Sequence, residues 1–306
     1  MRTAFINKLI ELARNDKNIY LITSDTGFSI LEEFEKLFSE QYLNIGISEA
    51  NMIGVASGLS LGGKKVFLYA IAPFITMRCF EQVRIDLCYQ NIPVKLIGVG
   101  AGLTYGNAGA THHSIEDIAV MNCLPNMTVI CPGDPIEVGK AVEESLKLNG
   151  PCYIRIGKSG EPNIHKEVPG SFSLGKGIRL RIGENVALVA TGNMLETAIK
   201  VYEILKEKNI DTEVISMHTV KPIDKEMIIE TSKRCKFIAT MEEHNVIGGL
   251  GSRVADVITE ENLNVRLKKF AIPDKYVDVV GDQDYLRNYY GLTAEQISEK
   301  ILSLIE

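Results

Sequence analysis

The sequence has 306 residues, of which 45% are hydrophobic and 24% charged, and its formal net charge is −6. A chain of this length is typical of two domains, each large enough to bury a core. The modest negative charge and the absence of a basic run argue against a nucleic-acid-binding protein and against binding to an anionic membrane surface.

The N-terminal segment and the cysteines favour a reducing, cytoplasmic environment. Residues 1–18 form an amphipathic pattern interrupted by charges, which differs from a signal peptide. No apolar run reaches the ~20 residues that a membrane-spanning helix needs. The six cysteines show no CxxC pair and no zinc-like spacing. We therefore expect a cytoplasmic protein with free, mostly buried thiols.

Along the first half of the chain, short apolar segments alternate with longer segments of helical periodicity. The expected strands are 19–23, 43–47, 66–71, 93–99, 125–132 and 151–156. The expected helices are 3–16, 30–39, 49–61, 74–90, 115–122 and 135–148. This alternation is typical of an α/β domain with a doubly wound parallel sheet.

The second half repeats the α/β pattern after a segment, 157–176, that is rich in Gly, Pro, Ser and Lys. Its expected strands are 186–191, 212–217, 236–241 and 265–272, and its expected helices are 193–208, 222–234, 249–260 and 293–305. We predict a first domain at 1–160, a linker at 161–176 and a smaller second domain at 177–306. We expect His165 at the surface of the linker, and His218 and His244 to be structural.

Several candidate functional residues follow the predicted strands, where ligands gather in open α/β sheets. Asp25 and Ser29 follow the first strand; a turn and a helix cap are the alternative for both. Glu49 lies where the second strand gives way to a helix with Ser48 at its cap position, so a solvated first-turn acid is the alternative. Phe74 opens the next helix, and a core position is its alternative.

The fourth strand opens into a Gly-rich loop, 100–113, that ends in the pair His112 and His113. This loop has neither a Walker motif nor the spacing of a dinucleotide fingerprint. A histidine pair at a ligand-binding edge suits proton transfer or hydrogen bonding near neutral pH, whereas no acid or cysteine lies at the spacing of a metal site. Arg155 and Lys158, around the end of the last strand, suit an anion or are ordinary surface charges.

The segments NIGISEANMIGVASGLSLGGKKVF, GATHHSIED, HTVKPID and EEHNVIGGLGS resemble the transketolase family of thiamine diphosphate enzymes, over the whole chain. The resemblance implies a pyrimidine-binding domain followed by the transketolase C-terminal domain. It implies that Glu49 hydrogen-bonds N1′ of the aminopyrimidine, which favours the imino tautomer and so supports proton removal by the cofactor's own 4′-imino group. Phe74 would stack on that ring, and Asp25 and Ile47 would line the cofactor site.

The same resemblance implies substrate-binding residues. His112 matches the histidine of the family's GxTH motif, which faces the substrate hydroxyls and the reacting carbon. His113 stands where the family usually has Gln, so this difference concerns substrate binding rather than cofactor binding. Ser29, Lys158 and Arg155 would hold a substrate phosphate. The GGLGS segment could bind an anion at a helix N-terminus, but a structural role in the second domain is favoured.

One part of the family's cofactor site has no match in this sequence. The GDG…N motif that holds Mg²⁺ and the diphosphate is absent; Gly281-Asp282-Gln283-Asp284 is the nearest approach. The resemblance therefore implies the C-terminal subunit of a split transketolase, with a partner N-terminal subunit that carries GDG…N in a heterotetramer. Such an enzyme moves a two-carbon ketol unit between sugar phosphates or modified sugars.

Two alternatives remain open at this point. One is another thiamine diphosphate enzyme, a deoxyxylulose phosphate synthase or the β subunit of a 2-oxoacid dehydrogenase. The synthase branch normally has an Arg where this chain has Gly98-Val99-Gly100, and the β subunits lack GATHHSIED. The other alternative is a non-catalytic scaffold, against which the joint presence of Glu49, Phe74 and His112 argues.

Overall fold

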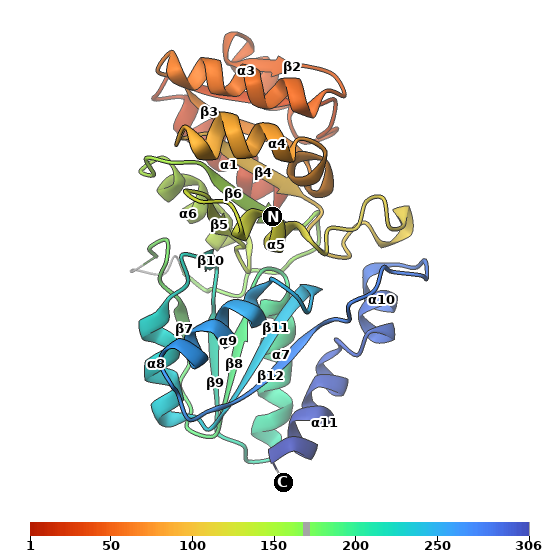
Figure 1. The fold of residues 1–306 in the computed structure, drawn as a ribbon. Helices are drawn as coiled ribbons and strands as arrows, with labels where there is room; N and C mark the ends of the chain where they lie inside the picture. Colours follow the sequence, from red (N-terminus) through yellow and green to blue (C-terminus); the bar gives the residue numbers. More distant parts are fainter. Residues whose placement is uncertain (168–171, 306) are drawn as a thin grey trace.

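The computed structural model describes residues 1–167 and 172–305, which form two α/β units lying one above the other (Figure 1). The N-terminal half of the chain, coloured red to yellow-green, builds one unit, and the C-terminal half, green to blue, builds the other. The predicted fold class, two successive α/β units, is confirmed. None of the helices within the described ranges combines the length and apolar character needed to cross a lipid bilayer.

The first sheet has seven strands in the order β10-β5-β6-β4-β3-β1-β2. Their bounds are β1 (Ile19–Thr23), β2 (Tyr42–Asn44), β3 (Lys65–Ile71), β4 (Lys95–Val99), β5 (Thr128–Ile130), β6 (Cys152–Ile156) and β10 (Thr219–Lys221). All neighbouring pairs are parallel except β10 with β5. The carboxyl ends of the six parallel strands therefore lie at one edge of the sheet.

Helices cover both faces of this sheet because the strands are apolar on both sides. On β3, Val66 and Leu68 belong to one core cluster, whereas Phe67 and Tyr69 belong to the other, as the period of two requires. The second of these faces is covered by α1 (Arg2–Ala13), α2 (Glu32–Leu37) and α6 (Pro135–Ser145). The first is covered by α3 (Glu49–Leu61), α5 (Asp117–Asn122) and the helical segment 74–89.

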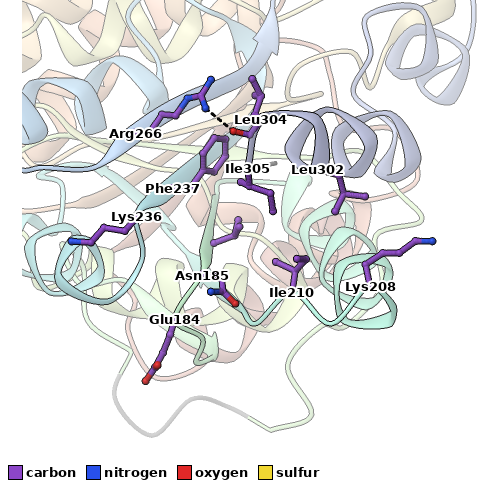
Figure 2. Close-up of a pocket in the computed structure, with 11 residues that line it drawn as sticks. Glu184, Asn185, Lys208, Ile210, Lys236, Phe237, Arg266, Leu302, Leu304 and Ile305 are labelled. Atoms are coloured by element: carbon purple, nitrogen blue, oxygen red, sulfur yellow. Dashed lines mark hydrogen bonds between the residues drawn. The ribbon is translucent and has the colours of Figure 1, made fainter.

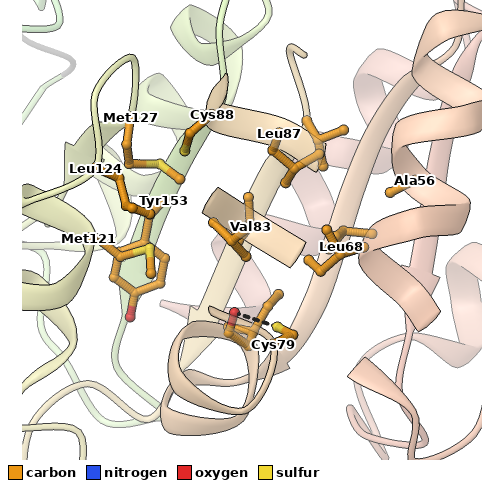
Figure 3. Close-up of a cluster of buried hydrophobic side chains, with 14 of the residues drawn as sticks. Ala56, Leu68, Cys79, Val83, Leu87, Cys88, Met121, Leu124, Met127 and Tyr153 are labelled. Atoms are coloured by element: carbon orange, nitrogen blue, oxygen red, sulfur yellow. Dashed lines mark hydrogen bonds between the residues drawn. The ribbon is translucent and has the colours of Figure 1, made fainter. Parts of the chain in front are cut away.

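The helical segment 74–89 is not the single α-helix that the sequence predicts. It consists of η2 (Phe74–Arg78) and η3 (Val83–Tyr89), both π-helical, on either side of the short α4 (Phe80–Gln82). Figure 3 shows this segment packed between α3 and the side chains of Met121 and Tyr153, with the Cys79 thiol donating to the carbonyl of Ile75 at 3.1 Å. A π-helical turn widens the helix, and such turns often lie at functional sites.

The second sheet has five strands in the order β12-β11-β8-β9-β7, of which only the edge strand β7 runs antiparallel to its neighbour. Its strands are β7 (Ile178–Arg181), β8 (Val186–Ala190), β9 (Thr212–Ser216), β11 (Phe237–Asn245) and β12 (Arg266–Ile272). Helices α7 (Met194–Glu207) and α11 (Ala294–Ile305) pack on one face, and α8 (Lys225–Arg234) and α9 (Leu250–Glu260) on the other.

Other sequence predictions need correction. The second strand ends at Asn44 rather than residue 47, because the Asn44 side chain accepts from the N–H of Gly46, whose φ is +74°. The Ser48 hydroxyl donates to the carbonyl of Ile45 instead of capping α3. The predicted helix at 115–122 begins at Asp117. The elements that were not predicted are η1 (Ser39–Gln41), η4 (Gly106–Ala108), β7, β10 and α10 (Gln283–Tyr289).

The segment predicted to be a linker is partly fixed. The backbone N–H groups of Ile164 and His165 both donate to the Asp134 carboxylate at 2.9 Å. His165, expected at the surface, instead places Nε2 2.8 Å from the Glu137 carboxylate, and its side chain is largely buried. The prediction was wrong because the polar composition of the segment does not reveal these buried acids. Residues 168–171 of the predicted linker lie outside the described residues.

The two units share a sheet, and a buried ion pair of the first unit also contacts the second. Strand β10, from the C-terminal half, completes the first sheet. Arg155, at the end of β6, pairs with Asp117 at 2.7 Å and also donates to the carbonyls of Ser114 and Glu243. Burial opposes the charge on Asp117, but the Arg155 guanidinium and the Tyr153 hydroxyl outweigh it and hold the pKa of this carboxyl below its ordinary value. The cluster fixes the second unit against the first.

Candidate functional site

The candidate residues gather at the carboxyl edge of the first sheet. Asp25 follows β1, Glu49 follows β2, Phe74 follows β3, His112 follows β4 and Lys158 follows β6. Because these strands are parallel neighbours, residues that are more than a hundred positions apart in sequence arrive at one edge. The structure therefore brings these predicted side chains to one edge of the sheet.

Glu49 is the first residue of α3, and its side chain is only 1% exposed. One carboxylate oxygen, Oε2, accepts from Arg78 Nη1 at 2.9 Å. The other, Oε1, is buried and has no hydrogen-bond partner among the described residues. A buried carboxylate oxygen without a partner is costly, so its presence indicates a group that a ligand completes. The alternative of a solvated first-turn acid does not agree with this burial.

Phe74 lies at the start of η2, directly after the turn that follows β3, and its ring is half-buried. The guanidinium carbon of Arg78 lies 4.1 Å from the centre of this ring. His112 approaches the same ring in an edge-on arrangement, with ring centres 5.3 Å apart. Phe74 is therefore a partly open aromatic surface beside Glu49 and His112, and not a core side chain. Arg78 was missed as a member of this group, since a cation in a helix predicts only a solvated face.

His112 continues into a second group of side chains. Its ring centre is 6.1 Å from that of Tyr105, and its Nδ1 lies 2.9 Å from the Thr111 hydroxyl. Lys158 Nζ lies 5.0 Å from the centre of the Tyr105 ring. Phe74, His112, Tyr105 and Lys158 thus form a continuous row along the edge, which ends in a cation.

The Gly-rich loop that carries His112 is held in place by the second unit. The Leu103 N–H donates to the carboxylate of Glu243, which also pairs with Arg287 of α10 at 2.6 Å. Burial opposes the charge on Glu243, but Arg287 and the neighbouring donors lower the pKa of this carboxyl. Gly102, at φ +61°, leaves no space for a Cβ, which would lie 2.3 Å from the Glu243 carboxylate. The C-terminal half therefore positions the Gly-rich loop through Glu243.

A small cavity of about 290 Å³ opens at the same edge, at the ends of β1, β3 and β4. Tyr69 lines it, and its hydroxyl is buried without a partner among the described residues. Arg2 also lines it and donates through Nε to the carbonyl of Lys158 at 2.7 Å. Sequence analysis missed Arg2, because a single Arg at the start of an amphipathic helix gives no signal.

The remaining predicted site residues divide into those at the edge and those in the interior. Asp25 and Ser29 lie at the edge with positive φ values of 54° and 64°, which are strained for residues with side chains. The Asn44 side-chain amide donates to the Asp25 carboxylate at 3.1 Å, and the Ser29 N–H donates to Glu32. Ile47, 75% exposed, also lies at the surface near Glu49.

Arg155 and His113 do not reach the edge. Arg155 is 1% exposed and its guanidinium is engaged by Asp117 and two carbonyls, so it is not available to a substrate phosphate. The sequence could not reveal this, because the acid partner comes from a different element. His113 is 3% exposed, and its Nε2 lies 3.1 Å from the carbonyl of Gly106, so it supports the loop from inside. Neither residue is retained in the substrate site.

Four other features singled out in the sequence have structural roles. The N-terminus of α9, in the GGLGS segment, is occupied by Glu242, whose carboxylate accepts from the N–H groups of Leu250 and Gly251 at 2.7 and 2.8 Å. His218 stacks on Phe172, and His244 Nε2 accepts from the Ala119 N–H at 3.3 Å. Asp282, in the nearest approach to a GDG motif, caps α10.

Neither a cluster of metal ligands nor a cavity in the second unit adds to this edge. Within residues 1–167 and 172–305, no group of three or more His, Cys, Asp or Glu is arranged to hold a metal ion. A cavity of about 770 Å³ lies in the second unit, where β8, β11 and β12 begin (Figure 2). It is lined by Phe237 and by Arg266, which donates to the carbonyl of Leu304 at 2.6 Å. This cavity lies apart from the carboxyl edge of the first sheet.

A doubly wound sheet that carries an incompletely paired buried carboxylate and an open aromatic ring at its carboxyl edge is an arrangement typical of ligand-binding α/β proteins. The chain belongs to the transketolase family. Residues 1–162 match the transketolase pyrimidine-binding domain, and residues 175–297 match the transketolase C-terminal domain.

Individual relatives support the same assignment. The chain is 38% identical over 304 residues to a putative transketolase C-terminal section of Methanocaldococcus jannaschii, covering 99% of this chain and 95% of that protein. It is 36% identical to a subunit of the apulose-4-phosphate transketolase of Phocaeicola vulgatus, covering 100% and 97% of the two chains. Among solved structures, a split-gene transketolase in an inactive β4 tetramer aligns with a TM-score of 0.92 at 35% identity, covering 99% and 97%.

Proposed function

We propose that this chain is the C-terminal subunit of a two-chain transketolase, which transfers a two-carbon ketol unit from a ketose to an aldose with thiamine diphosphate. The observation that carries the proposal is the buried Glu49 Oε1, which has no partner within residues 1–167 and 172–305, near the half-buried ring of Phe74. A carboxyl group and an aromatic face are what an aminopyrimidine ring requires. The naming of relatives as transketolase subunits supports the same function.

The residues fit the pyrimidine half of the cofactor. Glu49 would hydrogen-bond the ring nitrogen N1′ and hold a proton there, and Phe74 would fix the ring plane by stacking. Asp25 and Ile47, which lie at the same edge, would border the bound ring. When bound, thiamine diphosphate supplies the stabilisation of negative charge at carbon that breaking a C–C bond next to a carbonyl requires.

We assign the diphosphate and its Mg²⁺ to a partner subunit that carries the GDG…N motif. This assignment rests on the sequence of this chain, in which the motif is absent, and on the naming of relatives as subunits. The cofactor would then lie between the two kinds of subunit in a heterotetramer, and this chain alone would be inactive.

We assign the substrate to the row that runs from His112 to Lys158. His112 would orient a substrate hydroxyl and move its proton, since its Nδ1 is already oriented by Thr111. Lys158, Arg2 and Ser29 would bind a terminal anionic group, such as the phosphate of a sugar phosphate or the equivalent group of a modified sugar. Arg2 takes the place that sequence analysis gave to Arg155.

The test is a pull-down of the tagged chain from its native lysate, followed by a ketol-transfer assay with thiamine diphosphate and Mg²⁺. We expect a GDG…N partner to co-purify and activity to require both chains. Glu49→Gln should lower kcat by ~10²–10⁴-fold, because it removes a proton-holding group in the reaction. The matched control is Glu81→Gln, which changes a surface acid of the same unit that pairs with Arg84, and it should keep full activity.

Two outcomes would contradict the proposal. A complex that decarboxylates 2-oxoacids and transfers no ketol unit would favour the related thiamine diphosphate enzymes. The second outcome is a complex that is inactive with all ketose donors and whose affinity for the cofactor does not change in Glu49→Gln. It would favour a non-catalytic scaffold protein.

A further inference from the structure

Arg78 contacts both groups that the proposed function assigns to the aminopyrimidine. Its Nη1 donates to Glu49 Oε2 at 2.9 Å, and its guanidinium carbon lies 4.1 Å from the centre of the Phe74 ring. The side chain of Arg78 is 45% exposed, whereas that of Glu49 is 1% exposed. A single side chain thus links the buried carboxylate to the aromatic ring from the solvent side.

A guanidinium group offers the same recognition features as an aminopyrimidine. Both are planar, both present N–H donors to a carboxylate when the ring nitrogen is protonated, and both stack on an aromatic face. The Arg78 guanidinium covers one face of the Phe74 ring and at the same time donates to Glu49. A planar ligand that stacks on this face and bonds Glu49 therefore has to displace the guanidinium.

The position of Arg78 allows this displacement. It is the last residue of the π-helical segment η2, and its long side chain has solvent on one side. Only one ion pair and one cation–π contact hold it among the described residues, and a partly exposed ion pair is weak and is screened by salt. The neighbouring Arg84, in contrast, pairs with Glu81 at 2.9 Å on the exposed surface and touches neither Glu49 nor Phe74.

We propose that Arg78 occupies the pyrimidine position of the free chain and leaves it when the aminopyrimidine enters. This inference rests on the proposed function, since it concerns the same site. The apparent dissociation constant of a ligand equals its intrinsic value divided by the fraction of open molecules. If the guanidinium is in place about nine-tenths of the time, removing it raises the affinity about tenfold.

The experiment measures binding of the free pyrimidine half of thiamine, 4-amino-5-hydroxymethyl-2-methylpyrimidine, to the full chain by ligand-observed NMR. This probe needs neither the diphosphate site nor turnover. Arg78→Met removes the charge and the planar group at similar length, and we expect it to bind the probe about tenfold more tightly than the wild type. Arg84→Met is the matched control and should bind as the wild type does. Raising the NaCl concentration roughly tenfold, from about 50 to about 500 mM, should tighten binding of the probe to the wild type, because salt screens the ion pair of Arg78. It should not tighten binding of the probe to Arg78→Met.

The outcomes separate this inference from the proposed function. If Arg78→Met binds the probe no more tightly than the wild type does, or shows no detectable binding, the inference is overturned. If Glu49→Gln nevertheless abolishes partner-dependent transfer, the proposed function stands without it. Arg78→Gln, which keeps a donor to Glu49 but lacks the charge, should also bind more tightly; it serves if Arg78→Met does not fold, as judged by circular dichroism.

Discussion

Replacing Arg155 by Met tests whether this residue holds the two units together or binds substrate. In the structure, Arg155 donates to Asp117 at 2.7 Å and to the carbonyls of Ser114 and Glu243 at 2.7 and 3.0 Å, and it is 1% exposed. Methionine fills much of the same volume but donates nothing. The Asp117 carboxylate then keeps only the Tyr153 hydroxyl as a partner among the described residues.

Leaving a buried charge without its partner costs about 3–5 kcal/mol of unfolding free energy, far more than the net value of the pair itself. Asp117 can escape part of this cost by binding a proton. We therefore expect the full loss at pH 8 and a smaller loss at pH 5, because the variant lacks the guanidinium that lowers the pKa of this carboxyl in the wild type.

The assay is urea unfolding followed by far-UV circular dichroism at both pH values, with the slope of the transition as a test for separate unfolding of the two units. Lys158→Met, three residues away and partly exposed, is the control and should change stability by no more than about 0.5 kcal/mol. The structural role of Arg155 would be refuted if Arg155→Met lost less than about 1 kcal/mol of unfolding free energy and raised the KM of the complete enzyme.

Three further predictions concern single contacts. Gly102→Ala should destabilise the chain by about 1 kcal/mol or more and lower activity, because its Cβ would collide with Glu243; unchanged melting would contradict this. Burial raises the pKa of Glu242 to about 7, against about 4.5 when unfolded, so the native state binds the extra proton between these values and wild-type stability falls as pH rises through them. The unfolding free energy lost across this pH interval is on the order of 3 kcal/mol. Glu242→Gln should abolish this pH dependence, as measured by urea titrations. A thiol reagent should label Cys123 rapidly in the native chain and the five buried cysteines slowly; Cys123→Ser should lose the fast phase.

Periodicity alone was enough to predict the alternation of strands and helices. On β3, residues of both core clusters alternate, and this pattern of two apolar faces is local in sequence. The carboxyl-edge rule then predicted that Glu49, Phe74 and His112 lie at one edge of the sheet, where the structure has them, because each follows its strand within a short connection or a Gly-rich loop. Sequence similarity supplied their expected roles.

The sequence did not predict elements whose stability depends on distant partners. The three-residue β10 is too short to show a pattern, and it forms because β5 offers an open edge. The π-helical turns of η2 and η3 differ from an α-helix in their i→i+5 hydrogen bonds, which the apolar periodicity does not reveal, so their sequence predicted a continuous helix.

The sequence by itself determined the main strands and helices of the α/β alternation and the arrival of Glu49, Phe74 and His112 at one edge of the first sheet, since both follow from local periodicity and strand order. Only the tertiary structure decided which charged groups pair. Arg155 meets Asp117, Arg78 meets Glu49 and His165 meets Glu137 across 28 to 38 positions of sequence. These pairings depend on how helices pack on the sheet, which no local pattern encodes.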